Sequence, residues 1–250
     1  FSVQYNMMSK KVEYIIPDLK CVPDEFNNTA LTEIKDKCVE QGIERGAIFE
    51  AVRAIASKNP FCPVAMYIES AKWDGEKRIT KFIEQFKVSL DDEPYRALLI
   101  KKWLLQAVAA IYTKKFNNVG VLVISGSQGI GKTRAFKNLV SGIEDAFKEG
   151  HILDPKDKDN VLQANRRWIV ELGELDATFR KSDIAVLKGF ITNSEDIMRK
   201  PYAQEESKFE RRTVYCGTVN DAEFLHDRTG NRRFWALRVD SIELLDLKTF

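Results

Sequence analysis

One glycine-rich segment constrains the fold of this chain more than any other. The apolar run Val121 to Ile124 is typical of a buried strand, and it leads into the spacing Gly126-x-x-x-x-Gly131-Lys132-Thr133. This is the spacing of the phosphate-binding loop known as Walker A, which joins a strand to a helix. The sequence therefore predicts an α/β domain that binds a nucleoside triphosphate.

The chemistry of a triphosphate explains the residue types in this loop. Glycines let backbone N–H groups approach phosphate oxygens, and the helix that begins near Lys132 turns its positive dipole end toward the same anion. Lys132 is expected to reach the β- and γ-phosphates, and the Thr133 hydroxyl to ligate Mg²⁺. The alternative is an accidental glycine-rich turn, which the flanking strand and helix disfavour. We expect ATP and Mg²⁺ as cofactors, with nucleotide contacts from Gly126, Ser127, Gln128, Gly129, Ile130, Gly131, Lys132 and Thr133.

Composition excludes several other classes of protein. The 250 residues are 44% hydrophobic and 30% charged, as in an ordinary globular protein, and no apolar run is long enough to span a membrane. The chain has no signal peptide and its four cysteines are scattered, so we expect a cytoplasmic protein without a structural zinc site. A net charge of +2 leaves nucleic acid open as a partner, provided that the site is a local patch.

Hydrophobic patterning divides the chain into three segments. Residues 1–28 alternate around a polar turn and predict a short hairpin with a linker. Residues 29–118 show helical periodicity and predict an all-helical module. Residues 119–250 alternate strands with helices, which predicts a largely parallel sheet flanked by helices; the helix after the phosphate loop is expected to extend to Phe147. Because an initiator methionine is missing and the chain stops abruptly at Phe250, we interpret it as a fragment of a longer protein, truncated at its C-terminal side.

Acidic residues accompany the next apolar strand, near Trp168. A triphosphate hydrolase needs acids that hold Mg²⁺ and orient the attacking water. We assign Glu171 to the metal and Glu174 to the water, with Asp176 as a third choice. The alternative for Glu174 and Asp176 is the start of a solvated helix, whereas an acid inside a strand, such as Glu171, would be costly to bury without a function.

Two further groups fit the same chemistry. Asn220 ends the apolar strand that begins at Val214, where an amide can contact the γ-phosphate or the attacking water; an ordinary Asn-Asp turn is the alternative. Arg232 and Arg233 lie in a turn before the last strand, where they could neutralise charge on the γ-phosphoryl group. Surface salt bridges are the alternative for these arginines.

Basic residues interleaved with an aromatic one lie between the acids and Asn220. Cations can contact phosphates while the aromatic ring stacks on a base, which suits single-stranded nucleic acid. Acidic residues in the same stretch make an ordinary solvated surface an equally good interpretation. The candidate DNA contacts are Arg199, Lys200, Tyr202, Lys208, Arg211 and Arg212.

The order of these motifs closely resembles the virulence-associated E family. The resemblance covers roughly residues 59–239 and is carried by Asn59-Pro-Phe-Cys-Pro-Val, Trp73-Asp-Gly, the phosphate loop, Trp168-Ile-Val-Glu-Leu-Gly-Glu-Leu-Asp176, Lys200-Pro-Tyr202, Gly217-Thr-Val-Asn220 and Gly230-Asn-Arg-Arg-Phe-Trp235. Proteins of this family are grouped with superfamily 3-like AAA+ helicases of phages and mobile genetic elements, and are often fused to a primase.

The resemblance implies a role for each matching residue. It makes Glu171 and Glu174 the Walker B acids, Asn220 the sensor 1 residue and Arg232 or Arg233 the arginine finger. Residues 199–212 would form a DNA-contacting hairpin before sensor 1. Two features depart from the family pattern. Cys62 stands where a histidine is expected, and the acids are spaced Glu-x-x-Glu instead of adjacent, which leaves the division of their roles open.

The resemblance further implies an AAA+-type sheet in which the sensor 1 strand separates the Walker A and Walker B strands. The expected function is that of an ATP-driven helicase or translocase that acts on single-stranded DNA during replication of a phage or mobile genetic element. We expect it to work as a homo-oligomeric ring, and a hexamer is the expected size. A primase domain or protein is a further expected partner. We do not expect the protein to bind a membrane. One alternative is a nucleotide-switched helicase loader that remodels a protein without unwinding. A small-molecule kinase is disfavoured by the arginine-bearing turn and by the lack of an acceptor site.

Overall fold

The computed structural model describes residues 1–173, 175, 181–198, 206–220 and 231–244. The chain divides into two compact units, Phe1–Met66 and Tyr67–Phe250. This division differs from the boundaries expected at residues 28 and 118, because the second unit contains helices that the sequence pattern groups with the N-terminal module.

The first unit combines a small sheet with two helices. Strands β1 (Ser2–Asn6) and β2 (Lys11–Ile15) form the expected antiparallel hairpin, and β3 (Pro60–Phe61) pairs in parallel with β1. A single 3₁₀ turn, η1 (Pro23–Glu25), precedes helices α1 (Phe26–Glu40) and α2 (Arg45–Lys58). The apolar faces of both helices share one core with the first strand, made of Val3, Ile34, Ile48, Val52 and Ala56.

The second unit is built on the expected parallel sheet. Its five strands are ordered β11-β5-β10-β7-β6 and all pair in parallel. The bounds of these strands are Phe234–Arg238, Val121–Ser125, Val214–Val219, Ile169–Leu172 and Phe147–His151. Strand β10 lies between β5 and β7, as predicted for the strands that carry sensor 1, Walker A and Walker B. Every residue of β5 is buried, as is typical of a strand covered on both faces.

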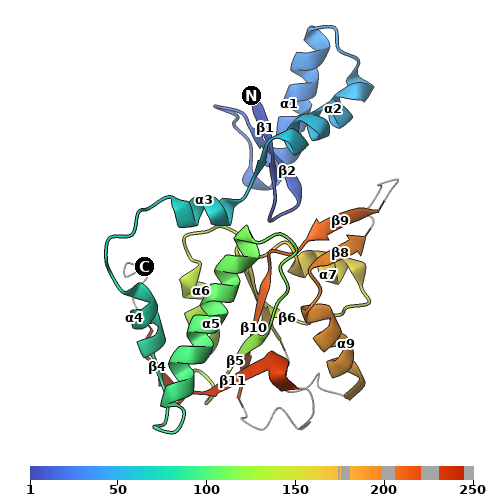
Figure 1. The fold of residues 1–250 in the computed structure, drawn as a ribbon. Helices are drawn as coiled ribbons and strands as arrows, with labels where there is room; N and C mark the ends of the chain where they lie inside the picture. Colours follow the sequence, from blue (N-terminus) through green and yellow to red (C-terminus); the bar gives the residue numbers. More distant parts are fainter. Residues whose placement is uncertain (174, 176–180, 199–205, 221–230, 245–250) are drawn as a thin grey trace. The chain divides into compact units, whose positions relative to one another are not determined.

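Helices flank both faces of this sheet (Figure 1). Valines of β5 and β7 pack with α7 (Lys158–Ala164) and α9 (Lys181–Ile191) in one core. On the other face, Trp103 of α5 (Glu93–Tyr112) meets Phe136 of α6 (Lys132–Leu139) with ring centroids 5.2 Å apart. The mixed α/β fold predicted from the sequence is therefore confirmed.

Helix α5 explains why the domain boundary falls earlier than expected. Its stripe of buried residues includes Ile100, Trp103 and Ala107, and the Trp103 indole Nε1 donates a hydrogen bond to the Tyr215 carbonyl of β10 at 2.8 Å. An apolar stripe shows that a helix packs against something, but it does not name the partner. The partner here is the five-stranded parallel sheet.

Two other expectations for the helices are corrected. The helix after the phosphate loop ends at Leu139 and not near Phe147, since Phe147 begins the edge strand β6. Gly142 lies in the intervening turn, where a Cβ atom would come within 2.6 Å of the Tyr67 ring. The expected all-helical module also contains β3 and a second two-residue strand, β4 (Phe86–Lys87).

Short strand pairs complete the second unit. After helices α3 (Pro63–Glu69) and α4 (Arg78–Glu84), strand β4 pairs with β12 (Ser241–Ile242), which follows the last strand of the sheet. Strands β8 (Glu195–Met198) and β9 (Ser207–Glu210) form an antiparallel hairpin directly before β10. Throughout the described residues, no helix is long and apolar enough to cross a membrane.

Candidate nucleotide-binding site

The phosphate loop joins β5 to α6 at the carboxyl edge of the sheet. Gly129 and Gly131 have φ angles of +83° and +93°, in the left-handed region that favours glycine, and α6 begins immediately after them at Lys132. The loop also packs closely against residues 239–244, which follow the last strand of the sheet. A Cβ atom at Gly126 would come within 2.4 Å of the Val239 carbonyl, and one at Gly131 within 3.1 Å of Leu244. The sequence of the loop is thus set by backbone conformation and by close packing.

Lys132 lies folded over its own loop. Its ammonium Nζ donates hydrogen bonds to the carbonyls of Gly126 and Ser127 at 2.7 and 2.8 Å, and to Asn220 Oδ1 at 3.1 Å. The side chain is 8% exposed. The predicted Walker A lysine and the predicted sensor 1 amide, 88 residues apart in the sequence, therefore meet at one point.

Glu171 is the acid that the fold places beside the phosphate loop. The residue is 3% exposed, and its carboxylate accepts hydrogen bonds from Thr133 at 2.5 Å, from Thr218 at 2.8 Å and from the backbone N–H of Gly150 at 3.2 Å. A hydroxyl and a carboxylate in contact are hard oxygen donors of the kind that Mg²⁺ prefers. These two residues therefore fit the expected metal. Glu174 and Asp176 lie outside the described residues.

A cavity of about 790 Å³ opens beside the loop and offers room for a nucleotide. The residues that line it come from the loop, from the end of β10 (called the sensor strand below) and from α6 and its surroundings. They are Gln128, Gly129, Gly131, Lys132 and Thr133, then Thr218 and Asn220, and finally Arg134, Lys137, Asn138, Ser141 and Glu149. Glycine backbone, a lysine and the Thr133 hydroxyl around one cavity, with Glu171 bonded to that hydroxyl, fit the donor set that a magnesium-bound triphosphate requires.

Thr218 belongs to this site although sequence reasoning missed it. Its hydroxyl donates to Glu171, and it lines the cavity together with Asn220. A signal was available, because residues two apart in a strand point to the same face, so Thr218 had to share the face of Asn220. The pKa of the neighbouring Cys216 thiol is raised well above its ordinary value, mainly because the thiol is buried and to a smaller extent because the Glu171 charge is close.

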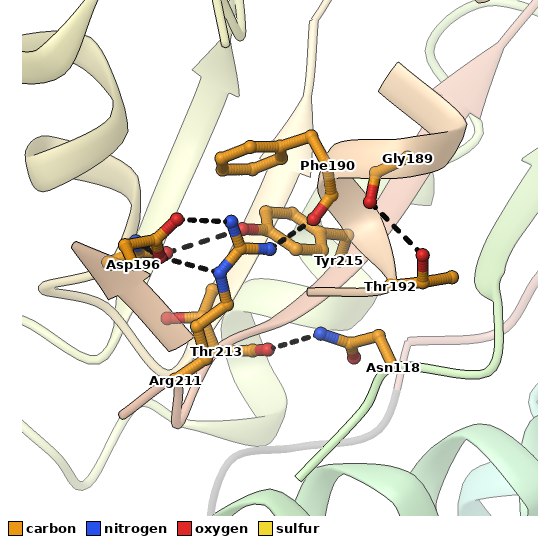
Figure 2. Close-up of polar contacts among 9 residues, drawn as sticks. Asn118, Gly189, Phe190, Thr192, Asp196, Arg211, Thr213 and Tyr215 are labelled. Carbon is orange, nitrogen blue, oxygen red and sulfur yellow. Dashed lines mark hydrogen bonds and ion pairs between the residues drawn. The ribbon is translucent and has the colours of Figure 1, made fainter. Parts of the chain in front are cut away.

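The predicted DNA contacts have different environments. Lys208 is exposed on β9, and Arg212 is partly buried against Glu210 at 2.9 Å. Arg211 is a correction. It is 1% exposed and its guanidinium pairs with Asp196 inside the protein, so it cannot reach a phosphate on the surface (Figure 2). Arg199, Lys200 and Tyr202 lie outside the described residues.

The two candidate finger arginines lie away from the phosphate loop of their own chain. They end a single turn, η2 (Asn231–Arg233), just before β11, and Arg232 is exposed. Phe234, which follows them, pairs with Val121 at the amino end of β5, whereas the loop follows Ser125. Four residues of strand correspond to about 13 Å. The fold therefore does not bring Arg232 and Arg233 to the loop within one chain.

The chain is similar to a known protein family and to solved structures. Two solved structures of the NrS-1 C terminal region are similar to it. The first has 19% sequence identity and a TM-score of 0.46, and the match covers 70% of this chain and 42% of that chain. The second has 17% identity and a TM-score of 0.47, and the match covers 70% of this chain and 41% of that chain. The chain thus spans about two fifths of the length of those structures. No curated protein matches. A family model for the virulence-associated protein E-like domain matches residues 68–249, which is well over half of the chain. The chain therefore belongs to the virulence-associated protein E-like family.

Proposed function

We propose that this chain is a magnesium-dependent ATPase that moves along single-stranded DNA during replication of a phage or mobile genetic element. The observation that carries the proposal is the convergence of Lys132, Thr133 and Asn220 on one cavity at the carboxyl edge of the sheet, with the buried Glu171 carboxylate bonded to the Thr133 hydroxyl. The sheet order β5-β10-β7 and the family membership support the same reading. A superfamily 3-like AAA+ motor is the class of enzyme that these features fit.

Each residue has a role that follows from its contacts. Lys132, which now donates to loop carbonyls, would exchange them for phosphate oxygens. Thr133 and Glu171 would hold the metal, and Thr218 keeps the Glu171 carboxylate turned toward the hydroxyl of Thr133. Asn220 would report the state of the γ-phosphate. For Glu174, which lies outside the described residues, the role of orienting the attacking water rests on the sequence motif alone. When bound, Mg²⁺ and ATP supply the transferable phosphoryl group and the charge that polarises it.

The remaining candidate residues are proposed to contact DNA or to act in the site of a second copy of the chain. The hairpin β8–β9 presents Lys208 to solvent directly before the sensor strand, which suits contact with the DNA backbone. Arg232 and Arg233 are far from the loop of their own chain, so a finger from this turn would serve a neighbouring subunit. This geometry favours a closed ring, and a hexamer is the size we propose. A primase domain or protein is proposed as an additional partner.

The deciding experiment measures ATP turnover with and without single-stranded DNA, beside the mass of the protein in solution. DNA-stimulated turnover by a ring is the expected result. Turnover that ignores DNA would instead favour a helicase loader that remodels a protein partner. A chain that neither binds nor hydrolyses ATP would overturn the proposal.

A further inference from the structure

The base of the β8–β9 hairpin contains a buried ion pair that the phosphate chemistry does not use. Arg211, just after β9, donates from Nε and Nη2 to the two carboxylate oxygens of Asp196 on β8, both at 2.6 Å. The side chains are 0% and 10% exposed. Burying two charges is unfavourable unless their hydrogen-bonding capacity is met, so the surroundings of this pair need an explanation.

Neighbouring elements meet that requirement (Figure 2). The Nη1 group of Arg211 donates to the carbonyl of Phe190 near the end of α9, and the guanidinium carbon lies 3.8 Å from the centre of the Phe190 ring. Asp196 accepts a further hydrogen bond, at 2.5 Å, from the amide of Asn165, which caps the end of α7. The hydroxyl of Tyr215 on β10 donates to Asn165 at 3.4 Å. The pair thus ties the hairpin to two helices and to the sensor strand.

Only Arg211, Arg212 and Thr213 connect the hairpin to the sensor strand, and the far end of this link is also fixed. The Thr213 hydroxyl donates to the Arg167 carbonyl at 2.6 Å, and the amide of Asn118 donates to the Thr213 carbonyl at 2.9 Å. Beyond Thr213, β10 runs from Val214 to Val219, and the next residue, Asn220, contacts Lys132. The hairpin base, the sensor strand and the phosphate loop therefore form one continuous set of fixed contacts.

We propose that Arg211 is a positioning residue: paired with Asp196, it fixes the β8–β9 hairpin in one orientation relative to the sensor strand, so that contacts made by the hairpin are transmitted to Asn220. The coupling to DNA rests on the proposed function, whereas the fixed orientation does not.

Arginine is suited to this task for a geometric reason. A planar guanidinium that bonds both carboxylate oxygens in parallel defines an angle as well as a distance. Lysine would keep the charge but could not make the two parallel hydrogen bonds and the contact with Phe190 together. Apolar residues could fill the space without loss of stability, since such replacements of buried ion pairs are often neutral or stabilising, but they define no such angle.

The first test is a distance measurement that needs no ligand. Spin labels at Glu206→Cys, beside the hairpin, and Leu98→Cys, on α5, are introduced after Cys21 and Cys38 have been replaced by serine. Both label positions are exposed. Double electron–electron resonance should give one narrow distance in the parent protein. Arg211→Lys should broaden or shift it. The control Arg167→Lys, which alters a partly exposed ion pair with Asp145, should leave it unchanged. An unchanged narrow distance in Arg211→Lys would overturn the proposal.

A second variant decides the matter if Arg211→Lys does not fold. The double variant Asp196→Leu/Arg211→Met removes both charges together and is expected to fold. A broadened distance in this folded protein supports the proposal, and a distance as narrow as in the parent overturns it.

Turnover then separates positioning from the proposed function. In Arg211→Lys, ATP turnover without DNA should stay close to that of the parent, while its stimulation by single-stranded DNA should fall by about fivefold or more. Stimulation that survives intact in a variant with a broadened distance would overturn the transmission to Asn220. Absence of stimulation in the parent itself would defeat the proposed function, and the distance measurement would still decide the positioning.

Discussion

At the scale of single residues, Lys132 holds together the parts of the candidate site. Its ammonium is shared between two loop carbonyls and Asn220, so one side chain joins the loop to the end of β10. Among the contacts of Asn220 described above, the Lys132 ammonium is the one that carries a positive charge. A bound phosphate would compete directly for these hydrogen bonds, because charge-assisted bonds to an anion are the stronger ones.

Replacing Lys132 by alanine should abolish ATP hydrolysis and leave the fold intact, because the side chain borders the open cavity. Glu171→Gln should instead preserve ATP binding and stop turnover, since the amide keeps the size of the acid but loses its charge. Turnover, nucleotide binding and thermal unfolding are measured together, with Lys37→Ala, an exposed residue of the first unit, as the control. Normal turnover in the Lys132 variant would disprove the phosphate-loop assignment.

His151 at the end of β6 gives the molecule a pH dependence of stability. Burial, assisted by Lys148, lowers the pKa of His151 below 6.5, although contacts with Asn160 oppose the shift. The unfolded chain therefore binds this proton first, and stability falls as pH drops through about 6.5. In His151→Gln, the free energy of unfolding should depend less steeply on pH between 7.5 and 5.5, by at most about 1.4 kcal/mol per pH unit. Chemical denaturation at several pH values measures this slope, and identical slopes in both proteins would contradict the prediction.

The residues of the phosphate site could be predicted because they follow a general rule of parallel sheets. Strands that run side by side bring their carboxyl ends to one edge, so the polar residues at or after β5, β7 and β10 had to be neighbours. Arg211 could not be predicted in this way. Its partner Asp196 is 15 residues distant, and both lie in a stretch rich in charges of either sign. No local pattern tells which cation of such a stretch is buried.

At the scale of elements, the hairpin and its neighbours show the limits of periodicity. The family resemblance implied a hairpin over residues 199–212. The structure contains a β8–β9 pairing before β10, but its first strand, Glu195–Met198, precedes the expected segment. Strand β6 escaped prediction, because its middle residues Lys148, Glu149 and Gly150 carry no apolar alternation and it pairs along one edge only. The destination of α5 was also hidden, since an amphipathic stripe reports burial and not the identity of the neighbour.

The exposed Lys208 tests the hairpin as a DNA contact. Lys208→Ala should weaken binding of single-stranded DNA to a similar extent across sequences and reduce the salt slope of log K by about 0.7, as expected for one lost phosphate contact. Fluorescence anisotropy at several salt concentrations measures both quantities. Lys58→Ala, at the exposed end of α2, serves as a matched loss of a surface lysine. Unchanged affinity and slope in the Lys208 variant would place the DNA site on another part of the molecule.

At the scale of the whole molecule, the arginines before β11 decide whether one chain can complete the site. In the sheet register, the residue after them pairs with the amino end of β5, while the loop leaves its carboxyl end. A single chain therefore brings Lys132, Thr133, Glu171 and Asn220 together in the candidate site but no arginine from this turn. If Arg232 or Arg233 stabilises the transition state, it must do so in the cavity of another copy, and hydrolysis then depends on assembly.

Loss of such an arginine should lower turnover by about 10³–10⁵-fold, far more than loss of a surface ion pair worth about 0–1 kcal/mol. Arg232→Ala, Arg233→Ala and the double variant are therefore compared first, to find which replacement inactivates the protein. The inactive variant is then mixed with Lys132→Ala, which is also inactive alone. Activity should return in the mixture, because some interfaces pair an intact phosphate loop with an intact arginine. If co-assembly is shown by mass and no activity returns, the arginine acts within its own chain or only in folding, and the shared site is wrong.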